Sequence, residues 1–138
     1  MRFFETHIEI LAPAERIWSI LTDASRLGPA YGLTRLQGNI ALGQTLRLQS
    51  EVAPGREFVL KVEAFDPPRR MIWTGGMPLG LFRGRRSYVL SQVPGGCDFH
   101  MREEYTGLLA PMMFRVLPDL TQSFRKFAAA LKKDAEHD

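Results

Sequence analysis

Alternation of apolar and polar residues through the middle of the chain is the feature that most constrains the fold. Leu46, Leu48 and Ser50 alternate with polar residues, and residues 58–64 repeat the pattern. Such a period of two is typical of a strand with one covered face. Because glycine and proline clusters separate these stretches throughout residues 33–109, we expect consecutive antiparallel strands joined by short turns.

Another alternating stretch, over residues 4–10, precedes this region and stops before Pro13. Pro13 suits the first turn of a helix, and apolar residues then recur at helical spacing up to Asp23. Asp23 can cap a second short helix over residues 24–32, which an internal Gly-Pro pair must end or distort. We therefore expect one strand and two short helices before the main sheet.

The C-terminal segment carries a stripe of apolar residues at helical spacing. These residues step by threes and fours, and the charged residues lie largely on the far side of the predicted helix. They are Phe114, Leu117, Leu120, Phe124, Phe127 and Leu131. Pro118 predicts a break, so we expect the longer helix to begin near it, to be continuous over residues 122–134 and to lie on the sheet.

Length and composition favour a single globular domain over residues 1–138, since 45% of the residues are hydrophobic. Every apolar stretch is shorter than the roughly 18 residues of a membrane span, and the N-terminal residues enter a strand pattern rather than a signal peptide. Cys97 is the only cysteine, which excludes an intramolecular disulfide and agrees with a reducing compartment. We expect a cytoplasmic protein without stable membrane insertion.

A net charge of +3 and a pI near 9.4 raise the question of a nucleic-acid partner. The densest basic run is RGRR at residues 83–86, and neither a recognised nucleic-acid-binding motif nor interleaved aromatic residues accompany it. A solvated turn explains such a run equally well. We expect no nucleic-acid partner, and nothing in the sequence indicates an oligomeric state.

The histidines give no sign of a metal site in the sequence. His7 and His100 fall on the outward side of their predicted strands and His137 lies in the tail, so no set of His, Cys and carboxylate residues has metal-ligand spacing. No Ser-His-Asp arrangement or glycine-rich phosphate loop is recognisable either. We expect no metal and no cofactor, and the sequence identifies no catalytic residue.

A carboxylate is expected to point into the protein from the last predicted strand. Alternate residues of a strand face opposite sides, so the adjacent Glu103 and Glu104 cannot both face solvent if one face is covered. Glu103 shares the mostly apolar side of its strand, and Arg86 lies on the inward side of the preceding strand. A hairpin between these strands places Arg86 and Glu103 on one face, within reach of a charge-assisted hydrogen bond.

Three interpretations of this pair are open. The two charges can neutralise one another as a structural pair, which offsets the cost of burying them. Alternatively, they can mark the polar end of a cavity in which Arg86 binds a carboxylate, carbonyl or phosphate. Thirdly, Glu103 can act in acid/base catalysis with a pKa raised by burial. Arg86 keeps its proton at ordinary pH and therefore serves as a fixed cation rather than a base.

Five segments resemble a known superfamily in their order and spacing: IEILAPAERIWSILTD, FDPPRRMIWTGG, GLFRGRRSYVL, REEYTGLLAP and FRKFAAALKKDAE. They are similar to the SRPBCC superfamily, which includes START domains, polyketide cyclase/dehydrases and birch-pollen-allergen-like proteins. The resemblance implies an α+β helix-grip fold, with a curved antiparallel sheet around a long C-terminal helix. Related bacterial sequences often carry His where this chain has Arg86, which puts any role that needs an imidazole there in doubt.

The resemblance implies that the chain binds or carries a small to medium hydrophobic ligand, of lipid, polyketide or aromatic type, between the sheet and the C-terminal helix. The expected ligand-binding residues are Phe58, Leu60, Met71, Trp73, Arg86, Tyr88, Phe99, Met101, Glu103 and Phe124. Tyr31 and the apolar loop over residues 77–82 can form a mouth or simply pack. A cyclase/dehydrase-like enzyme is the alternative, because one fold carries many activities, and an interaction module with a filled core is the third.

Overall fold

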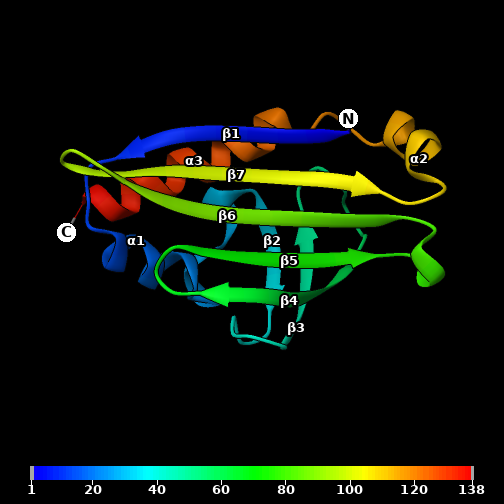
Figure 1. Ribbon diagram of the computed structural model, residues 1–138, viewed down its shortest axis with the longest axis horizontal. Helices are drawn as coiled ribbons and strands as arrows, with labels where there is room; N and C mark the ends of the chain where they lie inside the picture. Colours follow the sequence, from blue (N-terminus) through cyan, green and yellow to red (C-terminus); the bar gives the residue numbers. More distant parts are fainter. Residues whose placement is uncertain (1, 138) are drawn as a thin grey trace.

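The sheet has seven antiparallel strands, and the computed structural model describes residues 2–137 (Figure 1). The strands are β1 (Phe3–Ile10), β2 (Leu33–Gln37), β3 (Thr45–Ser50), β4 (Phe58–Asp66), β5 (Arg70–Gly76), β6 (Arg83–Val93) and β7 (Gly96–Thr106). The helices are α1 (Ala14–Leu21), α2 (Ala110–Val116) and α3 (Thr121–Glu136), with 3₁₀ turns η1 (Ala24–Arg26), η2 (Pro29–Tyr31) and η3 (Pro78–Gly80).

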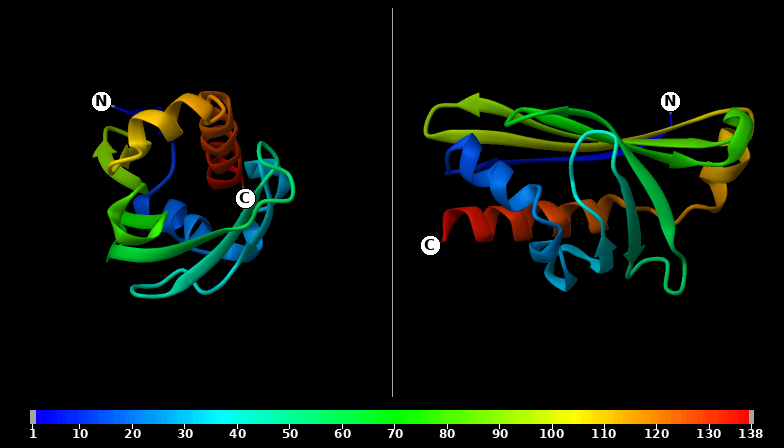
Figure 2. Two further views of the ribbon diagram at one scale, coloured as in Figure 1. Left: turned by 90° about the vertical axis from the view of Figure 1, so that its right-hand side faces the viewer. Right: turned by 90° about the horizontal axis from the view of Figure 1, so that it is seen from below.

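Strand order in the sheet is β1-β7-β6-β5-β4-β3-β2, so strands β2 to β7 form a meander and β1 pairs with the last strand. Seen along its length, the sheet curls around α3, which lies in the concave side (Figure 2). This is the α+β helix-grip architecture that the alternating pattern and the C-terminal stripe predict. None of the helices within the described residues is long and apolar enough to cross a membrane.

The predicted second short helix is interrupted at the Gly-Pro pair, as expected, and its two parts are 3₁₀ rather than α-helical. Residues 24–32 form two separate 3₁₀ turns, η1 and η2, with Gly28 between them. Pro29 explains the interruption, because proline lacks an N–H and disfavours helical backbone at the residue before it. The predicted cap is confirmed, since the Asp23 carboxylate accepts a hydrogen bond from the Ser25 backbone N–H at 3.1 Å.

The break before the long helix is confirmed. Leu117 has extended backbone, with φ −71° and ψ 141°, as expected for a residue that precedes a proline. The long helix α3 then runs without interruption from Thr121 to Glu136 and buries Phe124, Phe127 and Leu131. It packs along β1 and lies beneath the concave face of the sheet.

Aromatic side chains fill much of the space between α3 and the sheet. Phe127 lies at their centre, with ring centroids 5.0 Å from Tyr31, 5.8 Å from Tyr88 and 6.3 Å from Phe99. All four side chains are at most 2% exposed. The interior is therefore a packed core on which the candidate site is built.

Candidate functional site

Arg86 on β6 and Glu103 on β7 are direct cross-strand partners. Arg86 Nη2 donates a hydrogen bond to Glu103 Oε2 at 2.9 Å, and the two side chains are only 15% and 14% exposed. The expected inward direction of both residues and the expected contact between them are confirmed. Cross-strand pairing fixes the contact, because both residues extend from the same face of adjacent strands.

A tyrosine and a phenylalanine complete the surroundings of this ion pair. Tyr105 Oη donates to the same Glu103 oxygen at 3.0 Å, and the Arg86 guanidinium carbon lies 5.1 Å from the centroid of the Phe124 ring. Gly84 lies opposite Tyr105 in β6, and a Cβ there would lie 3.2 Å from Glu103 Oε1. The parity of β7 indicates that Tyr105 is inward, but it does not predict the bond to Glu103.

The protonation states follow from burial and from the neighbouring charges. Burial by itself lowers the pKa of Arg86, but the Glu103 carboxylate and nearby tyrosine hydroxyls outweigh burial and raise it. Burial and the Glu103 charge raise the pKa of Tyr105 far above its usual range. Arg86 is therefore a permanent cation and Tyr105 a permanent hydrogen-bond donor at physiological pH.

Beside the ion pair, three buried polar atoms have no hydrogen-bond partner among the described residues: Trp73 Nε1, Arg86 Nε and Tyr88 Oη. Trp73 is the cross-strand neighbour of Arg86, and its ring lies 4.8 Å from the Tyr88 ring. Burial raises the pKa of Tyr88 to about 12, against the opposing effects of the Arg86 charge and of a hydrogen-bond contact with Arg86, so its hydroxyl stays protonated. That contact is not a well-formed hydrogen bond, and Tyr88 Oη has no partner of good geometry. Buried polar groups without partners are rare in proteins, and three neighbouring donors need an explanation.

The other predicted ligand-binding residues divide into two groups. Met71, Phe99 and Met101 are fully buried in the core, and Leu60 packs against it. Phe58 lies instead at the start of β4, 38% exposed, with the Arg56 guanidinium 5.7 Å from its ring centroid. The structure thus gathers Trp73, Tyr88 and Phe124 around the Arg86–Glu103 pair and leaves Phe58 at the surface.

The apolar loop over residues 77–82 lies beside α2 at one end of the molecule (Figure 1). The backbone N–H of Leu109 donates to the Leu81 carbonyl at 2.7 Å, which links the loop to the start of α2. Phe82 from the loop and Phe114 from α2 pack on Tyr105, with ring centroids 5.8 and 5.7 Å away. The loop and α2 therefore cover the Tyr105 end of the site.

Tyr31 has a different environment from the one expected of a mouth residue. Its hydroxyl donates to Asp134 Oδ2 of α3 at 2.6 Å, and its ring packs on Phe127. Helix α3 holds it in the core, where it is 2% exposed. Of the two possibilities that the sequence left open, Tyr31 therefore packs.

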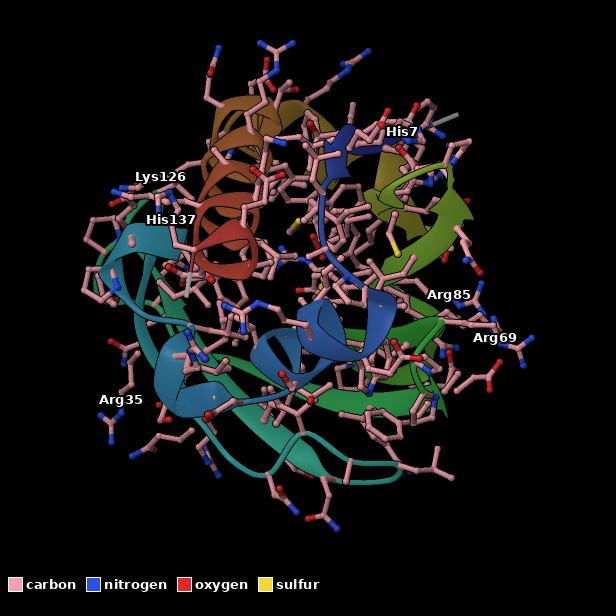
Figure 3. All side chains as sticks on the ribbon, turned by 90° about the vertical axis from the view of Figure 1, so that its left-hand side faces the viewer. His7, Arg35, Arg69, Arg85, Lys126 and His137 are labelled. Atoms are coloured by element: carbon pink, nitrogen blue, oxygen red, sulfur yellow. The ribbon has the colours of Figure 1, made fainter. Side chains whose placement is uncertain are left out.

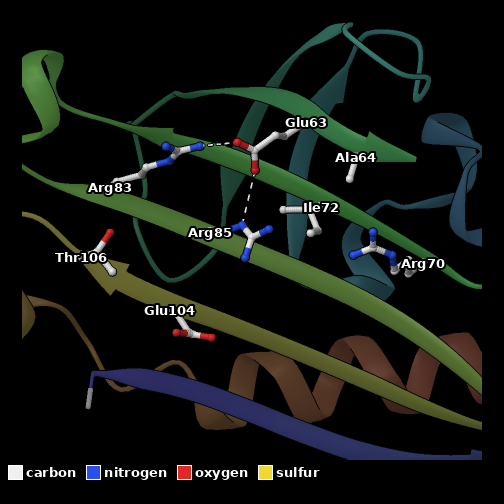
Figure 4. Close-up of a pocket in the computed structure, with 8 residues that line it drawn as sticks. All are labelled: Glu63, Ala64, Arg70, Ile72, Arg83, Arg85, Glu104 and Thr106. Carbon is white, nitrogen blue, oxygen red and sulfur yellow. Dashed lines mark hydrogen bonds and ion pairs between the residues drawn. The ribbon is translucent and has the colours of Figure 1, made fainter. Parts of the chain in front are cut away.

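Two shallow hollows lie on the surface of the described residues. One, of about 370 Å³, lies on the outer face of the sheet, where Glu63 accepts hydrogen bonds from Arg83 and Arg85 (Figure 4). The other, of about 520 Å³, lies at the turn from β7 into α2. Neither is lined by residues of α3, so neither is the expected cavity between the helix and the sheet.

Comparison with known proteins gives a family and a fold. The family model described as polyketide cyclase / dehydrase and lipid transport matches residues 1–136. No curated protein sequence is significantly similar to the chain.

Solved structures match over nearly the whole chain. The Aha1 dimer from Colwellia psychrerythraea is 20% identical with a TM-score of 0.75, covering 99% of this chain and 97% of that one. Norcoclaurine synthase from Thalictrum flavum, in complex with dopamine and hydroxybenzaldehyde, is 17% identical with a TM-score of 0.72, covering 99% and 88%. The Helicobacter pylori hypothetical protein jhp0584 is 13% identical with a TM-score of 0.77, covering 96% and 87%. At these identities the likenesses show the fold alone.

Proposed function

This chain belongs to the polyketide cyclase/dehydrase and lipid transport family, and we propose on that premise that it binds a hydrophobic molecule between α3 and the sheet. The ligand is small or medium-sized and carries one hydrogen-bond acceptor, a carbonyl or carboxylate. Trp73, Arg86 and Tyr88 donate to that acceptor. The observation that carries the proposal is the group of three neighbouring buried donors without partners.

The energetics of burial favour a ligand at this place. A buried donor that lacks a partner costs about 1–3 kcal/mol. Trp73 Nε1 has no partner, and Tyr88 Oη and the Arg86 guanidinium, which lie beside one another, make no well-formed hydrogen bond through Oη and Nε. A carbonyl oxygen has two lone pairs and can satisfy two of these donors, whereas a carboxylate has about four acceptor sites and can satisfy all three. Arg86 keeps its bond to Glu103 through Nη2 while Nε remains available, so the structural and ligand-binding interpretations of the pair are compatible.

Entry of a ligand requires the core to open, because aromatic rings occupy the space beneath the sheet. The end formed by the 77–82 loop and α2 is the best route. Its helix has only seven residues, and the apolar side chains Leu79 and Val116 at this end are 95% and 74% exposed. Movement of Phe82 and Phe114 away from Tyr105 would uncover the Arg86 cluster. An aromatic ligand agrees with the dopamine and hydroxybenzaldehyde in norcoclaurine synthase.

The test compares two ligands of nearly equal shape, 2-naphthoic acid and 2-methylnaphthalene, with Trp73 fluorescence as the readout. Trp18→Phe protein is used, because Trp18 in α1 would contribute to the signal. We expect the acid to change the fluorescence of Trp73 and to bind at least about tenfold more tightly, a difference of 1.4 kcal/mol. Tyr88→Phe should remove much of this preference with little change in stability, because it deletes a hydroxyl that makes no well-formed hydrogen bond. Equal affinity for both ligands would contradict the proposed role of the donors, and absence of binding to either would favour the interaction module.

A cyclase/dehydrase-like enzyme remains the alternative function, because donors that hold a carbonyl also polarise it. Such chemistry needs a base, and Glu103, the carboxylate beside these donors, already accepts hydrogen bonds from Arg86 and Tyr105. We therefore expect binding without proton abstraction. Hydrogen–deuterium exchange at the methyl group of 2-acetonaphthone, followed by NMR, should be no faster with the protein than in buffer. Exchange that the protein accelerates and Glu103→Gln abolishes would establish the enzyme instead.

A further inference from the structure

Two histidines that the sequence places 93 positions apart, His7 and His100, are direct cross-strand partners in β1 and β7. Glu5 precedes His7 by two residues and so lies on the same face of β1. Sequence spacing missed this group, because pairing of the first strand with the last one brings the three residues together. The sequence-based expectation of no metal site rests on spacing along the chain, whereas this group is formed by strand pairing.

The possible ligand atoms of Glu5, His7 and His100 all lie within 4.8 Å of one another. His100 Nε2 is 2.8 Å from Glu5 Oε1, and the two imidazole rings are parallel, with centroids 3.9 Å apart. The cluster lies on the outer face of the sheet, where His7 is at the periphery of the molecule (Figure 3). The His7 side chain is 55% exposed, so an ion can reach the cluster from solvent.

A carboxylate behind the cluster orients one of the imidazoles. Asp98 Oδ2 lies 3.1 Å from His7 Nδ1, and this hydrogen bond favours the tautomer in which Nδ1 carries the proton. Nε2 of His7 then keeps a free lone pair. A carboxylate that accepts from the far nitrogen of a histidine is the usual outer partner of a metal-ligating imidazole.

We infer that Glu5, His7 and His100 form a binding site for a divalent transition-metal ion of the Zn²⁺ class. Two imidazole nitrogens and one carboxylate oxygen are ligands that Zn²⁺ prefers, and three protein ligands leave the fourth tetrahedral position to water. The ion would replace the hydrogen bond between His100 Nε2 and Glu5 Oε1. Convergence on one ion needs rotation of the rings about χ2, a torsion with a broad energy profile.

Local charge also favours a cation at this position. The carboxylates of Glu5 and Asp98 face the imidazoles, and the competing cation is Arg102, whose Nη1 lies 3.5 Å from Glu5 Oε1. Arg102 also donates to Glu104 and packs over the Phe3 ring at 3.9 Å, so these contacts hold it beside the cluster when an ion displaces it from Glu5. A bound ion would connect β1 to β7 on the face opposite the Arg86 site.

The test is titration of untagged, metal-free protein with ZnCl₂ in a calorimeter, together with NMR of the histidine side-chain nitrogens. We expect one ion per chain and shifts of the His7 and His100 nitrogens. His7→Asn and His100→Asn should each weaken binding at least tenfold, and Asp98→Asn about tenfold through loss of the orienting bond. His137→Asn, which changes an exposed histidine outside the cluster, is the matched control and should leave the affinity unchanged.

Two outcomes of these experiments would contradict the proposed metal site. Lack of zinc binding by the folded wild-type protein at millimolar ZnCl₂ would overturn the inference, as would binding that survives both His7→Asn and His100→Asn. If a histidine variant does not fold, the zinc-dependent NMR shifts of the wild-type protein still show which histidines bind the ion. Zinc-dependent shifts confined to His137 would then overturn the inference.

Discussion

Arg86→Met and Glu103→Gln are each expected to lower the free energy of unfolding by about 3–5 kcal/mol, because each leaves a buried charged group without its partner. The double variant should recover much of this loss, since neither charge then remains. Chemical denaturation of the four proteins measures the coupling between the two side chains. A coupling below about 0.5 kcal/mol would contradict the contact between Arg86 and Glu103.

A matched control is available one residue away on the same two strands. Arg85 and Glu104 also lie opposite one another, but they face solvent, with side chains 55% and 42% exposed, and each has another ionic partner, Glu63 for Arg85 and Arg102 for Glu104. Their corresponding variants, Arg85→Met and Glu104→Gln, should each change stability by less than about 1 kcal/mol. The comparison separates the effect of burial from the effect of charge, because the strands and residue types are the same.

Phe127→Ala is expected to destabilise the protein by about 3–5 kcal/mol. The side chain is 2% exposed and contacts three aromatic rings, so its removal leaves a cavity at the centre of the core. Val116→Ala, at a position that is 74% exposed, is the surface control and should change stability by less than about 0.5 kcal/mol. A loss below about 1 kcal/mol for Phe127→Ala would mean that α3 packs on the sheet through another face.

Periodicity predicts those parts of the molecule that depend on one face being covered. The inward position of Glu103 and Arg86 follows from strand parity, and the face of α3 follows from the spacing of Phe124, Phe127 and Leu131. A single sequence does not reveal how two segments distant in the chain align. The contact of His7 with His100 and the position of Phe114 on Tyr105 depend on that alignment, so neither was predicted.

The periodicity of the sequence also does not predict how much free volume the protein interior contains. Parity assigns Trp73, Tyr88 and Phe99 to the interior, but whether such rings enclose a cavity or fill it depends on their rotamers and on the curvature of the sheet. Here they fill it. Whether Trp73 Nε1 and Tyr88 Oη find hydrogen-bond partners depends on the distances and angles of the folded side chains, which no sequence pattern encodes.

Pairing of β1 with β7 has a consequence for the order of folding. Strands β2 to β7 join neighbours in sequence, whereas the contact between Glu5 and His100 spans 95 residues. Closing so long a loop has a large entropic cost, which non-local pairing repays only late in folding. On the ribosome, β1 has no partner strand until β7 has been made, and its apolar side stays uncovered until α3 follows. The first strand to be synthesised is thus the last one that can join the sheet, and this delay makes β1 the segment with the longest exposure to aggregation or to chaperones.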